Sequence, residues 1–545
     1  MENRVHHHSL ILAVVLAGVL AVDNAAAQEH RLPDIGSSAG TVLSPARQAE
    51  YGAMTLAQLR NEGYILDDPL LDGWLRDVGQ RLSGGSDRPQ QAFNFFLLRD
   101  RQINAFATLG GYIGMNAGLI LAADREDEVA GVLAHEIAHV TQQHVLRGAE
   151  KAQRDSLPIL LATLGAIVAA QKAGGNTSGD ATQAAVMGGM GLLQQRMIDY
   201  TRDNEAEADR VGIRNLARGG YDPVAMAEFF ETLHAVVRMN QGDERSRVPG
   251  YLQTHPVTLS RVSEARERAG KLEQPVAAPA RTTMTNSPLL PAGLMIGAST
   301  PRTGGSGDFG WARERLRVLT ANTPGHAVRE YQQMRGSKPL DAAQRYGLAF
   351  AQLQAGEHAE ALREFGALHA ASPGDIWLQI ALGEAEARAG RATDADRRFE
   401  ALLARLPTQR ALALSYSRVL AERNTPAAGR RAVAILRPLA TSAATDALFQ
   451  QTYARVNEIA GDDVRAGEAW AEAAVLNGRP EQALVQLNNL KKRSTLDYYA
   501  RSRIDARIAA ITPTVLELRR QGIRDEDATG KLGWGVRAGR RPAVF

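Results

Sequence analysis

Apolar residues recur at helical spacing along most of this chain. Over residues 48–82, and again over 128–144, they repeat every three to four positions, which predicts amphipathic helices. Between these segments, residues 92–98 and 102–113 are apolar and aromatic and predict strands, the second with a bend or bulge at a Gly-Gly pair. The pattern predicts a mostly helical α+β domain with a small sheet.

The second half of the chain contains an internal repeat. Five positions recur 34 residues later: Leu348, Gly356, Ala361, Phe365 and Pro373 become Leu382, Gly390, Ala395, Phe399 and Pro407. Partial copies with the same internal offsets follow: Gly461, Ala466 and Trp470, then Gly478, Ala483 and Leu487. This period is typical of tetratricopeptide helix pairs, so an all-α tetratricopeptide solenoid is expected after the α+β domain.

Composition changes divide the chain into segments. A stretch rich in Pro, Ala, Ser and Gly at 271–309 predicts a linker. The expected organisation is a signal peptide (1–27), the α+β domain (28–270), the linker (271–309), the repeat domain (310–510) and a C-terminal tail (511–545).

The first 27 residues resemble a secretory signal. An apolar run over 10–22 precedes a small-x-small cleavage site ending at Ala27, which favours a periplasmic location over the alternative of a membrane anchor, because the run is short for a bilayer. Two further apolar segments within 157–193 are also short. They form either a buried hairpin or a flap that makes peripheral contact with a membrane or a partner.

Charge and cysteine content exclude several classes of function. The 63 basic residues nearly balance the 60 acidic ones, which argues against nucleic acid as a partner. The chain has no cysteine, so thiolate metal sites, cysteine nucleophiles and lipoprotein anchoring are excluded. Any metal must therefore be bound by His, Asp or Glu.

The motif His-Glu-Ile-Ala-His at 135–139 carries the candidate chemistry. A helix with Asp124 as its N-cap would place His135 and His139 on one face, where both imidazoles can bind one ion, and Glu136 beside the bound water. The alternative is an ordinary amphipathic helix, whose apolar positions would form a separate core face. His144, five residues past His139, is expected to lie about 140° round the helix and to point away.

A second acidic helix offers the third ligand. Glu205 and Asp209 are four residues apart, so Glu205 can bind the metal while Asp209 hydrogen-bonds a histidine ring; Glu207 is expected to point elsewhere. A solvated acidic face is the alternative. The predicted site holds one Zn²⁺ per chain with an open position for water, and Glu136 acts as the base that takes a proton from this water.

These residues resemble the gluzincin family that contains the heat-shock membrane protease HtpX and the CAAX prenyl proteases. "NAFATLGGYIGMNAGLI" from Asn104 and "THPVTLSR" with His255 and Arg261 also match its pattern. The resemblance implies a zincin-type domain in which His255 lies near the metal, either assisting catalysis or capping the zinc, and Arg261 anchors its loop. It also implies a substrate-binding edge strand that contains Asn104, Ala105, Phe106, Ala107, Gly110 and Gly111.

With a signal segment in front and repeats behind, the chain is similar to periplasmic members of this family. The resemblance implies a zinc endopeptidase that degrades misassembled outer-membrane proteins and supports β-barrel assembly, with the repeats binding substrate or the barrel-assembly machinery. The alternative is a repeat-based chaperone or scaffold of that machinery whose protease domain is mostly latent.

Overall fold

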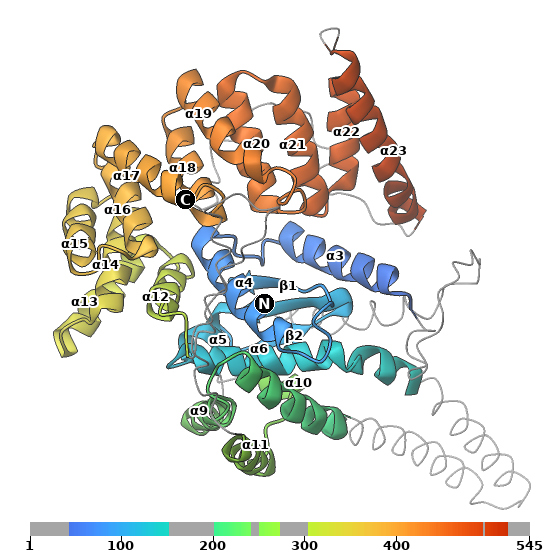
Figure 1. The fold of residues 1–545 in the computed structure, drawn as a ribbon, viewed down its shortest axis with the longest axis vertical. Coiled ribbons are helices and arrows are strands. Elements are labelled where there is room, and N and C mark those ends of the chain that lie inside the picture. The colour runs from blue at the N-terminus through green and yellow to red at the C-terminus, as the bar shows by residue number, and fades with distance from the viewer. Residues whose placement is uncertain (1–42, 152–200, 241–249, 273–303, 494–495, 521–545) are drawn as a thin grey trace, which may run out of the picture. The chain divides into compact units, whose positions relative to one another are not determined.

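The computed structural model describes residues 43–151, 201–240, 250–272, 304–493 and 496–520 (Figure 1). The expected signal peptide, the apolar 157–193 segment, most of the 271–309 linker and the end of the C-terminal tail lie outside these ranges. Among the described residues, no helix combines the length and apolar character needed to cross a bilayer.

The periodic stretch over 48–82 forms two helices, α3 (Pro45–Asn61) and α4 (Pro69–Gly84), where one continuous pattern was expected. Asp68 begins α4, since its carboxylate accepts hydrogen bonds from the backbone N–H groups of Leu70 and Leu71. A proline follows each cap, at a position where its missing N–H costs nothing.

The sheet has three strands, β1 (Asn94–Leu98), β2 (Ala105–Ala107) and β3 (Tyr112–Asn116). Their order is β1-β3-β2; β1 runs parallel to β3, and β2 runs antiparallel to it at an edge.

The prediction of one bent strand over 102–113 was therefore wrong. Gly110 and Gly111 have φ of 72° and 81° and lie in a 3-10 turn (η2, Leu109–Gly111) between β2 and β3. They are not part of the edge strand. A Cβ on Gly111 would also lie 2.2 Å from the carbonyl oxygen of Ala92.

After β3 the chain forms α5 (Ala117–Ala122) and α6 (Glu126–Thr141). The N-cap of α6 is Arg125, not the expected Asp124, whose backbone N–H instead donates to the Glu128 carboxylate. Glu126 and Asp127 lie in the first turn, as expected, where the helix dipole favours acidic residues. Nearly every residue of α6 is buried, so the helix has no solvated face.

Five further helices lie in the described part of the N-terminal half. Two cover residues 144–151 and 201–218; the others are α9 (Ala225–Asn240), α10 (Gly250–Thr254) and α11 (Leu259–Lys271). Glycines permit close helix packing here: a Cβ on Gly212 would lie 3.1 Å from the backbone nitrogen of His135 in α6. The 201–218 helix thus lies directly against the first histidine of the motif.

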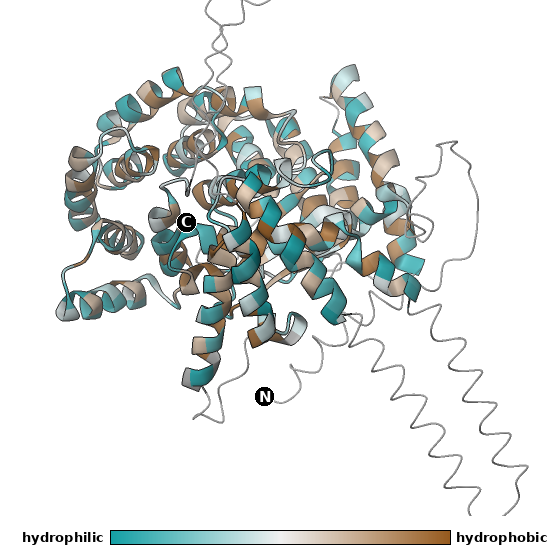
Figure 2. Cartoon of the chain, turned by 60° about the horizontal axis from the view of Figure 1, so that its bottom comes forward, coloured by the Kyte–Doolittle hydropathy of each residue, from teal (hydrophilic) through white to brown (hydrophobic). Residues whose placement is uncertain are grey.

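The C-terminal half is helical throughout its described part. Consecutive helices pack on one another, and Figure 2 shows hydrophobic and hydrophilic residues alternating along them. Their bounds are α12 (Phe309–Leu319), α13 (Pro324–Ser337), α14 (Ala342–Ala355), α15 (His358–Ala371), α16 (Ile376–Arg388), α17 (Ala392–Arg405), α18 (Arg410–Glu422), α19 (Pro426–Leu436), η3 (Arg437–Leu439), α20 (Ala447–Ala460), α21 (Asp463–Leu476), α22 (Pro480–Lys491) and α23 (Tyr498–Arg520).

The repeated sequence positions occupy equivalent places in these helices. Gly356 and Gly390 follow α14 and α16 with φ of 88° and 80°, which favours glycine. The repeated Ala and Phe positions of α15 and α17 are fully buried. The 34-residue spacing therefore corresponds to a repeated helix–turn–helix unit.

The two halves share one core. Buried apolar residues form a continuous cluster from Leu66 in the N-terminal half to Val456 in α20. Polar contacts accompany it: Asp68 pairs with Arg315 of α12, both side chains being about 5% exposed or less (4% and 5%). Glu126, at the start of α6, accepts hydrogen bonds from Trp74, Tyr221 and Ser306, and so holds the segment that leads into α12.

Candidate metal centre

Helix α6 positions the two histidines of the motif. His135 and His139 are one turn apart and direct their Nε2 atoms toward each other, 3.0 Å apart. His135 is fully buried and the His139 side chain is 12% exposed. The sequence pattern gave α6 a separate metal face and core face, but both faces are buried, because α4, α9 and the sheet region surround the helix.

The 201–218 helix brings a carboxylate to the histidines, as predicted. Glu205 Oε2 lies 3.4 Å from His135 Nε2, and Glu205 Oε1 lies 3.4 Å from His139 Nε2. One turn later, Asp209 Oδ1 lies 3.0 Å from the other ring nitrogen of His135, Nδ1. Asp209 therefore orients His135 from behind, as a carboxylate commonly does for a metal-binding histidine.

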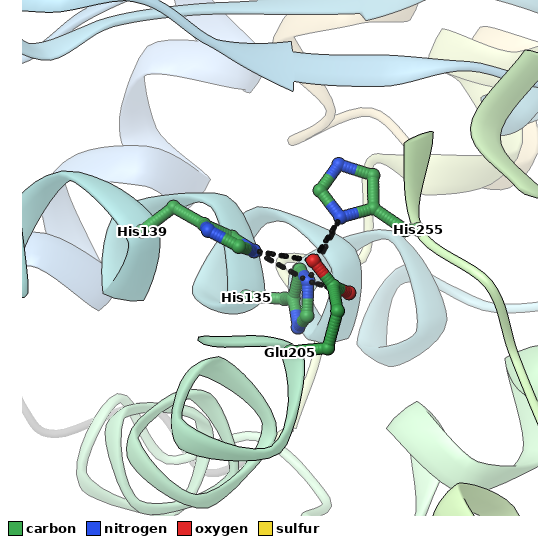
Figure 3. A group of neighbouring side chains, drawn as sticks. All are labelled: His135, His139, Glu205 and His255. Atoms are coloured by element: carbon green, nitrogen blue, oxygen red, sulfur yellow. Dashed lines mark hydrogen bonds and ion pairs between the residues drawn. The ribbon is translucent and has the colours of Figure 1, made fainter. Parts of the chain in front are cut away.

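His255 completes the cluster from the loop after α10 (Figure 3). Its Nδ1 lies 2.9 Å from Glu205 Oε1 and 3.4 Å from His135 Nε2. One ligand atom from each of His135, His139, Glu205 and His255 can be chosen so that all four lie within 4.8 Å of one another. The expected site had three protein ligands and an open position, whereas the structure brings together four candidate donors.

The donor distances fit one tetrahedral ion. With metal–ligand bonds of about 2.0–2.1 Å, tetrahedral geometry places neighbouring donor atoms about 3.3–3.4 Å apart. The five separations given above between Nε2 of the two motif histidines, His255 Nδ1 and the Glu205 oxygens lie between 2.9 and 3.4 Å. All four side chains are buried, and the set consists of imidazole and carboxylate, so the residues fit a metal ion.

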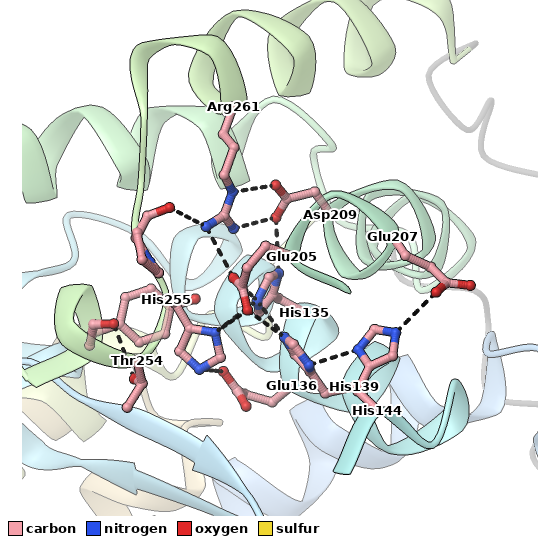
Figure 4. Close-up of polar contacts among 12 residues, drawn as sticks. His135, Glu136, His139, His144, Glu205, Glu207, Asp209, Thr254, His255 and Arg261 are labelled. Atoms are coloured by element: carbon pink, nitrogen blue, oxygen red, sulfur yellow. Dashed lines mark hydrogen bonds and ion pairs between the residues drawn. The ribbon is translucent and has the colours of Figure 1, made fainter. Parts of the chain in front are cut away.

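Arg261 holds the carboxylates and the loop in place (Figure 4). It donates to both Asp209 oxygens at 2.7 and 2.8 Å, and its third nitrogen lies 3.0 Å from Glu205 Oε2. The same guanidinium donates to the Pro256 carbonyl at 2.7 Å. Arg261 thus anchors the loop that carries His255, as the sequence resemblance implied.

Burial and neighbouring charges set the protonation of the donor side chains. Burial lowers the pKa of an imidazole, but hydrogen bonds to Asp209 and Glu205 outweigh it and raise the pKa of His135 to about 10. Burial lowers the pKa of His139 to about 3. Burial would raise the pKa of Glu205, yet the three histidines hold it well below its usual range. Glu205 is therefore an ionised carboxylate, and an ion bound here would displace a proton from His135.

Glu136 lies beside the cluster and does not take part in it. It is almost fully buried, and its Oε1 has no hydrogen-bond partner among the described residues; His255 Nε2 lies 3.5 Å away. A buried carboxylate oxygen without a partner is costly, so its retention here indicates a functional role. Its role as the base stays a prediction.

Two neighbours of the cluster were not found from the sequence. Tyr251 of α10 is fully buried and stacks on His255, with ring centroids 4.8 Å apart. His144 was expected to point away, but its Nδ1 lies 2.8 Å from His139 Nδ1. Glu207 points away from the cluster, as expected, and contacts His144.

The predicted substrate strand is reduced to β2. Ala105, Phe106 and Ala107 form it, Asn104 precedes it, and the glycine pair lies in the following turn. The Tyr251 backbone N–H donates to the Ile103 carbonyl, which links α10 to the residues just before β2.

A His-Glu-x-x-His helix packed against a glutamate-bearing helix around a buried donor cluster defines a metallopeptidase domain. Residues 69–269 match the sequence model of peptidase family M48. The chain is 39% identical over 241 residues to the beta-barrel assembly-enhancing protease of Escherichia coli K12, a match that covers 44% of this chain and 47% of the relative.

A second relative has the same name and a similar degree of identity. The chain is 38% identical over 242 residues to the beta-barrel assembly-enhancing protease of Yersinia pestis, covering 44% of this chain and 48% of the relative. The chain thus matches about half the length of these curated relatives. The metalloprotease LoiP of E. coli K12 is 28% identical over 186 residues, which cover 34% of this chain and 66% of LoiP.

Proposed function

We propose that this chain is a zinc-dependent endopeptidase. The observation that carries the proposal is the cluster of His135, His139, Glu205 and His255, whose donor atoms have the separations of a tetrahedral zinc site, next to a buried Glu136 with an unpartnered oxygen. One zinc ion per chain would supply Lewis-acid activation of a water molecule and of a peptide carbonyl.

The neighbouring side chains transfer protons or position the metal ligands. Glu136 accepts a proton from the attacking water and delivers it to the leaving amine, which is general base and general acid catalysis by one group. Asp209 lies 3.0 Å from His135 Nδ1, and Arg261 contacts both Asp209 and Glu205, so the ligands are held before the substrate arrives.

We propose further that His255 caps the zinc in the resting enzyme. Its Nδ1 occupies the fourth donor position, which a catalytic zinc site keeps for water. Catalysis then requires His255 to leave that position. The loop that carries His255 is short, and Arg261 anchors it at the Pro256 carbonyl, so the loop holds His255 in place at rest. This geometry supports capping over a direct role in the reaction.

The substrate is proposed to bind as an extended strand along β2. Among the described strands β2 has one neighbour, β3, so its other edge offers backbone groups for pairing. Because α10 is hydrogen-bonded to Ile103, two residues before β2, a peptide bound at this edge lies close to the loop that carries His255.

The helical C-terminal half is proposed to be a tetratricopeptide-repeat region that binds substrates or partners. The 34-residue spacing and the buried Ala and Phe positions support this assignment. The relatives are named beta-barrel assembly-enhancing proteases, and this name supports a role in the assembly of β-barrel proteins. Misassembled outer-membrane proteins as substrates, the barrel-assembly machinery as partner and the periplasm as the location are proposed from the sequence resemblance and from the signal-like first 27 residues.

The closed donor set also favours a second candidate function. A chain whose fourth zinc position is occupied by its own histidine could act mainly as a chaperone or scaffold of barrel assembly, with a latent protease. The buried Glu136 beside the donor cluster favours the peptidase, since a scaffold needs no base beside the metal.

The deciding experiment compares Glu136→Gln with Glu267→Gln, a substitution at an exposed position of α11. Removing a general base is expected to lower cleavage of unfolded outer-membrane protein by about 100- to 10,000-fold, with zinc content by elemental analysis unchanged. The control should cleave like wild type. Equal cleavage by Glu136→Gln would refute the peptidase mechanism, and zinc well below one per chain in the wild type would refute the site.

A further inference from the structure

The chain turns sharply just after the metal-binding helix. Helix α6 ends at Thr141, and Gln143 has φ of 56°, a left-handed conformation that non-glycine residues rarely adopt. A new helix begins at His144 and continues through residue 151. This turn rotates His144 back toward α6, so that its Nδ1 lies 2.8 Å from Nδ1 of His139.

The opposite side of the His144 ring is also engaged (Figure 4). Its Nε2 lies 3.2 Å from Glu207 Oε2, and Arg147, on the same helix as His144, donates to this oxygen at 3.0 Å. His144 is buried, with 4% exposure, while Glu207 is 29% exposed. The ring thus connects a metal-site histidine to a carboxylate near the surface.

The hydrogen-bond chemistry of the three residues fixes the direction of every proton. An ionised carboxylate only accepts, so the His144 Nε2 that faces Glu207 carries the hydrogen. A neutral imidazole then has a bare Nδ1, which accepts from His139. His139 must therefore carry its hydrogen on Nδ1, which leaves its Nε2 lone pair directed at the other donors.

Glu207 is suited to this role. Two donors converge on its Oε2, the His144 Nε2 at 3.2 Å and the Arg147 guanidinium at 3.0 Å, so this oxygen acts as an acceptor. Gln143 has a left-handed backbone, and such strain persists at functional positions when the surroundings impose it.

We propose that His144, held by Glu207 and Arg147, is a positioning residue that fixes the tautomer and ring orientation of His139 for metal binding. The inference rests on the proposed zinc site. In this proposal His144 contacts Nδ1 of His139 as Asp209 contacts Nδ1 of His135. Each histidine of the motif is then oriented by a partner on the ring nitrogen that faces away from the metal.

The test measures zinc affinity of the full chain by competition with a chelating indicator, apart from any cleavage. His144→Leu removes the acceptor and should weaken zinc binding about 10- to 100-fold, the usual cost of losing such a partner. His144→Asn, whose side-chain oxygen can replace Nδ1 as acceptor, should recover most of the affinity. Glu207→Ala should give an intermediate loss. His326→Leu, at an exposed position of α13, should bind like wild type.

Visible absorption of the Co²⁺-loaded protein gives a second readout: the His144→Leu spectrum should differ from wild type, and the His144→Asn spectrum should resemble it. Affinity of His144→Leu within about twofold of wild type would overturn the proposal, as would equal losses in the Leu and Asn variants. If His144→Leu does not fold, the zinc affinity of Glu207→Ala is the deciding measurement. An affinity of Glu207→Ala equal to that of wild type overturns the proposal. A wild type that binds zinc but does not cleave refutes the proposed peptidase function and leaves the positioning role intact.

Discussion

The Asp68–Arg315 ion pair should contribute strongly to stability. Arg315 donates to the Asp68 carboxylate at 2.8 and 2.9 Å, and both side chains are almost completely buried. Replacing Arg315 by Met leaves a buried carboxylate without its cation. Breaking a buried pair on one side costs about 3–5 kcal/mol, several times the value of an exposed pair.

The two single substitutions should differ in cost. Asp68 also caps α4 through the backbone of Leu70 and Leu71, and these bonds partly compensate its charge, so Arg315→Met should cost about 3 kcal/mol. Asp68→Asn keeps the cap, because Asn caps as well as Asp, but leaves a buried guanidinium and should cost nearer 5 kcal/mol. The double variant buries no charge and should cost at least about 2 kcal/mol less than the sum.

Urea unfolding followed by tryptophan fluorescence measures these differences, since Trp74 and Trp311 lie on α4 and α12, the helices that the pair joins. A cost below about 1 kcal/mol for Arg315→Met, or additive single costs, would refute the reasoning. Acid provides a check. Burial raises the pKa of Asp68, but Arg315 lowers it further, to below the ordinary 3.8, so its stabilisation is present above that pH and is lost as the pH falls through the folded pKa. Asp68→Asn should lack this loss.

Three further predictions concern the site and its support. Gly212→Ala should lower the free energy of unfolding by about 1–3 kcal/mol and weaken zinc binding, because the added Cβ meets the His135 backbone. Gly366→Ala, in open space on α15, should raise the free energy of unfolding by about 0.5–1 kcal/mol. Thermal unfolding measures both variants, and equal effects would contradict the steric argument. Removing zinc with a chelator should lower Tm, and zinc but not magnesium should restore it; an unchanged Tm would mean that no ion stabilises the fold. Glu126→Gln should cost about 1–3 kcal/mol, because the amide NH₂ meets donors such as the Trp74 indole; a neutral effect in urea unfolding would show that this hydrogen-bond group contributes little.

The parts of the site that sequence could predict follow from regular helix geometry. His135 and His139, and likewise Glu205 and Asp209, are four residues apart, and this spacing alone places each pair on one face. The 34-residue spacing predicted a repeated helix pair, because the same local helical unit recurs along the chain. Family resemblance added His255 and Arg261, which no local spacing connects to the motif.

The failures occur where the backbone leaves regular geometry or where contacts are distant in sequence. His144 was misplaced because the helix was extended through Gln143, and glutamine gives no signal for a left-handed residue. The 102–113 strand was drawn as one element because its glycines were interpreted as a bulge, whereas their φ values form a turn between two strands. No local pattern indicates that Asp68 meets Arg315, 247 residues away.

The shared core has a consequence for the timing of maturation. Every proposed metal ligand precedes α11 in the chain, so all of them are synthesised before the helices that complete their surroundings. A nascent chain that has reached Lys271 lacks both Arg315, the counter-ion of Asp68, and Ser306, which Glu126 holds beneath α6. We therefore expect a chain truncated at Lys271 to be more protease-sensitive than the full chain. Full protection by the truncated chain would contradict this. The proposed metal site is therefore expected to reach its final packing only after the segment through α12 has been made.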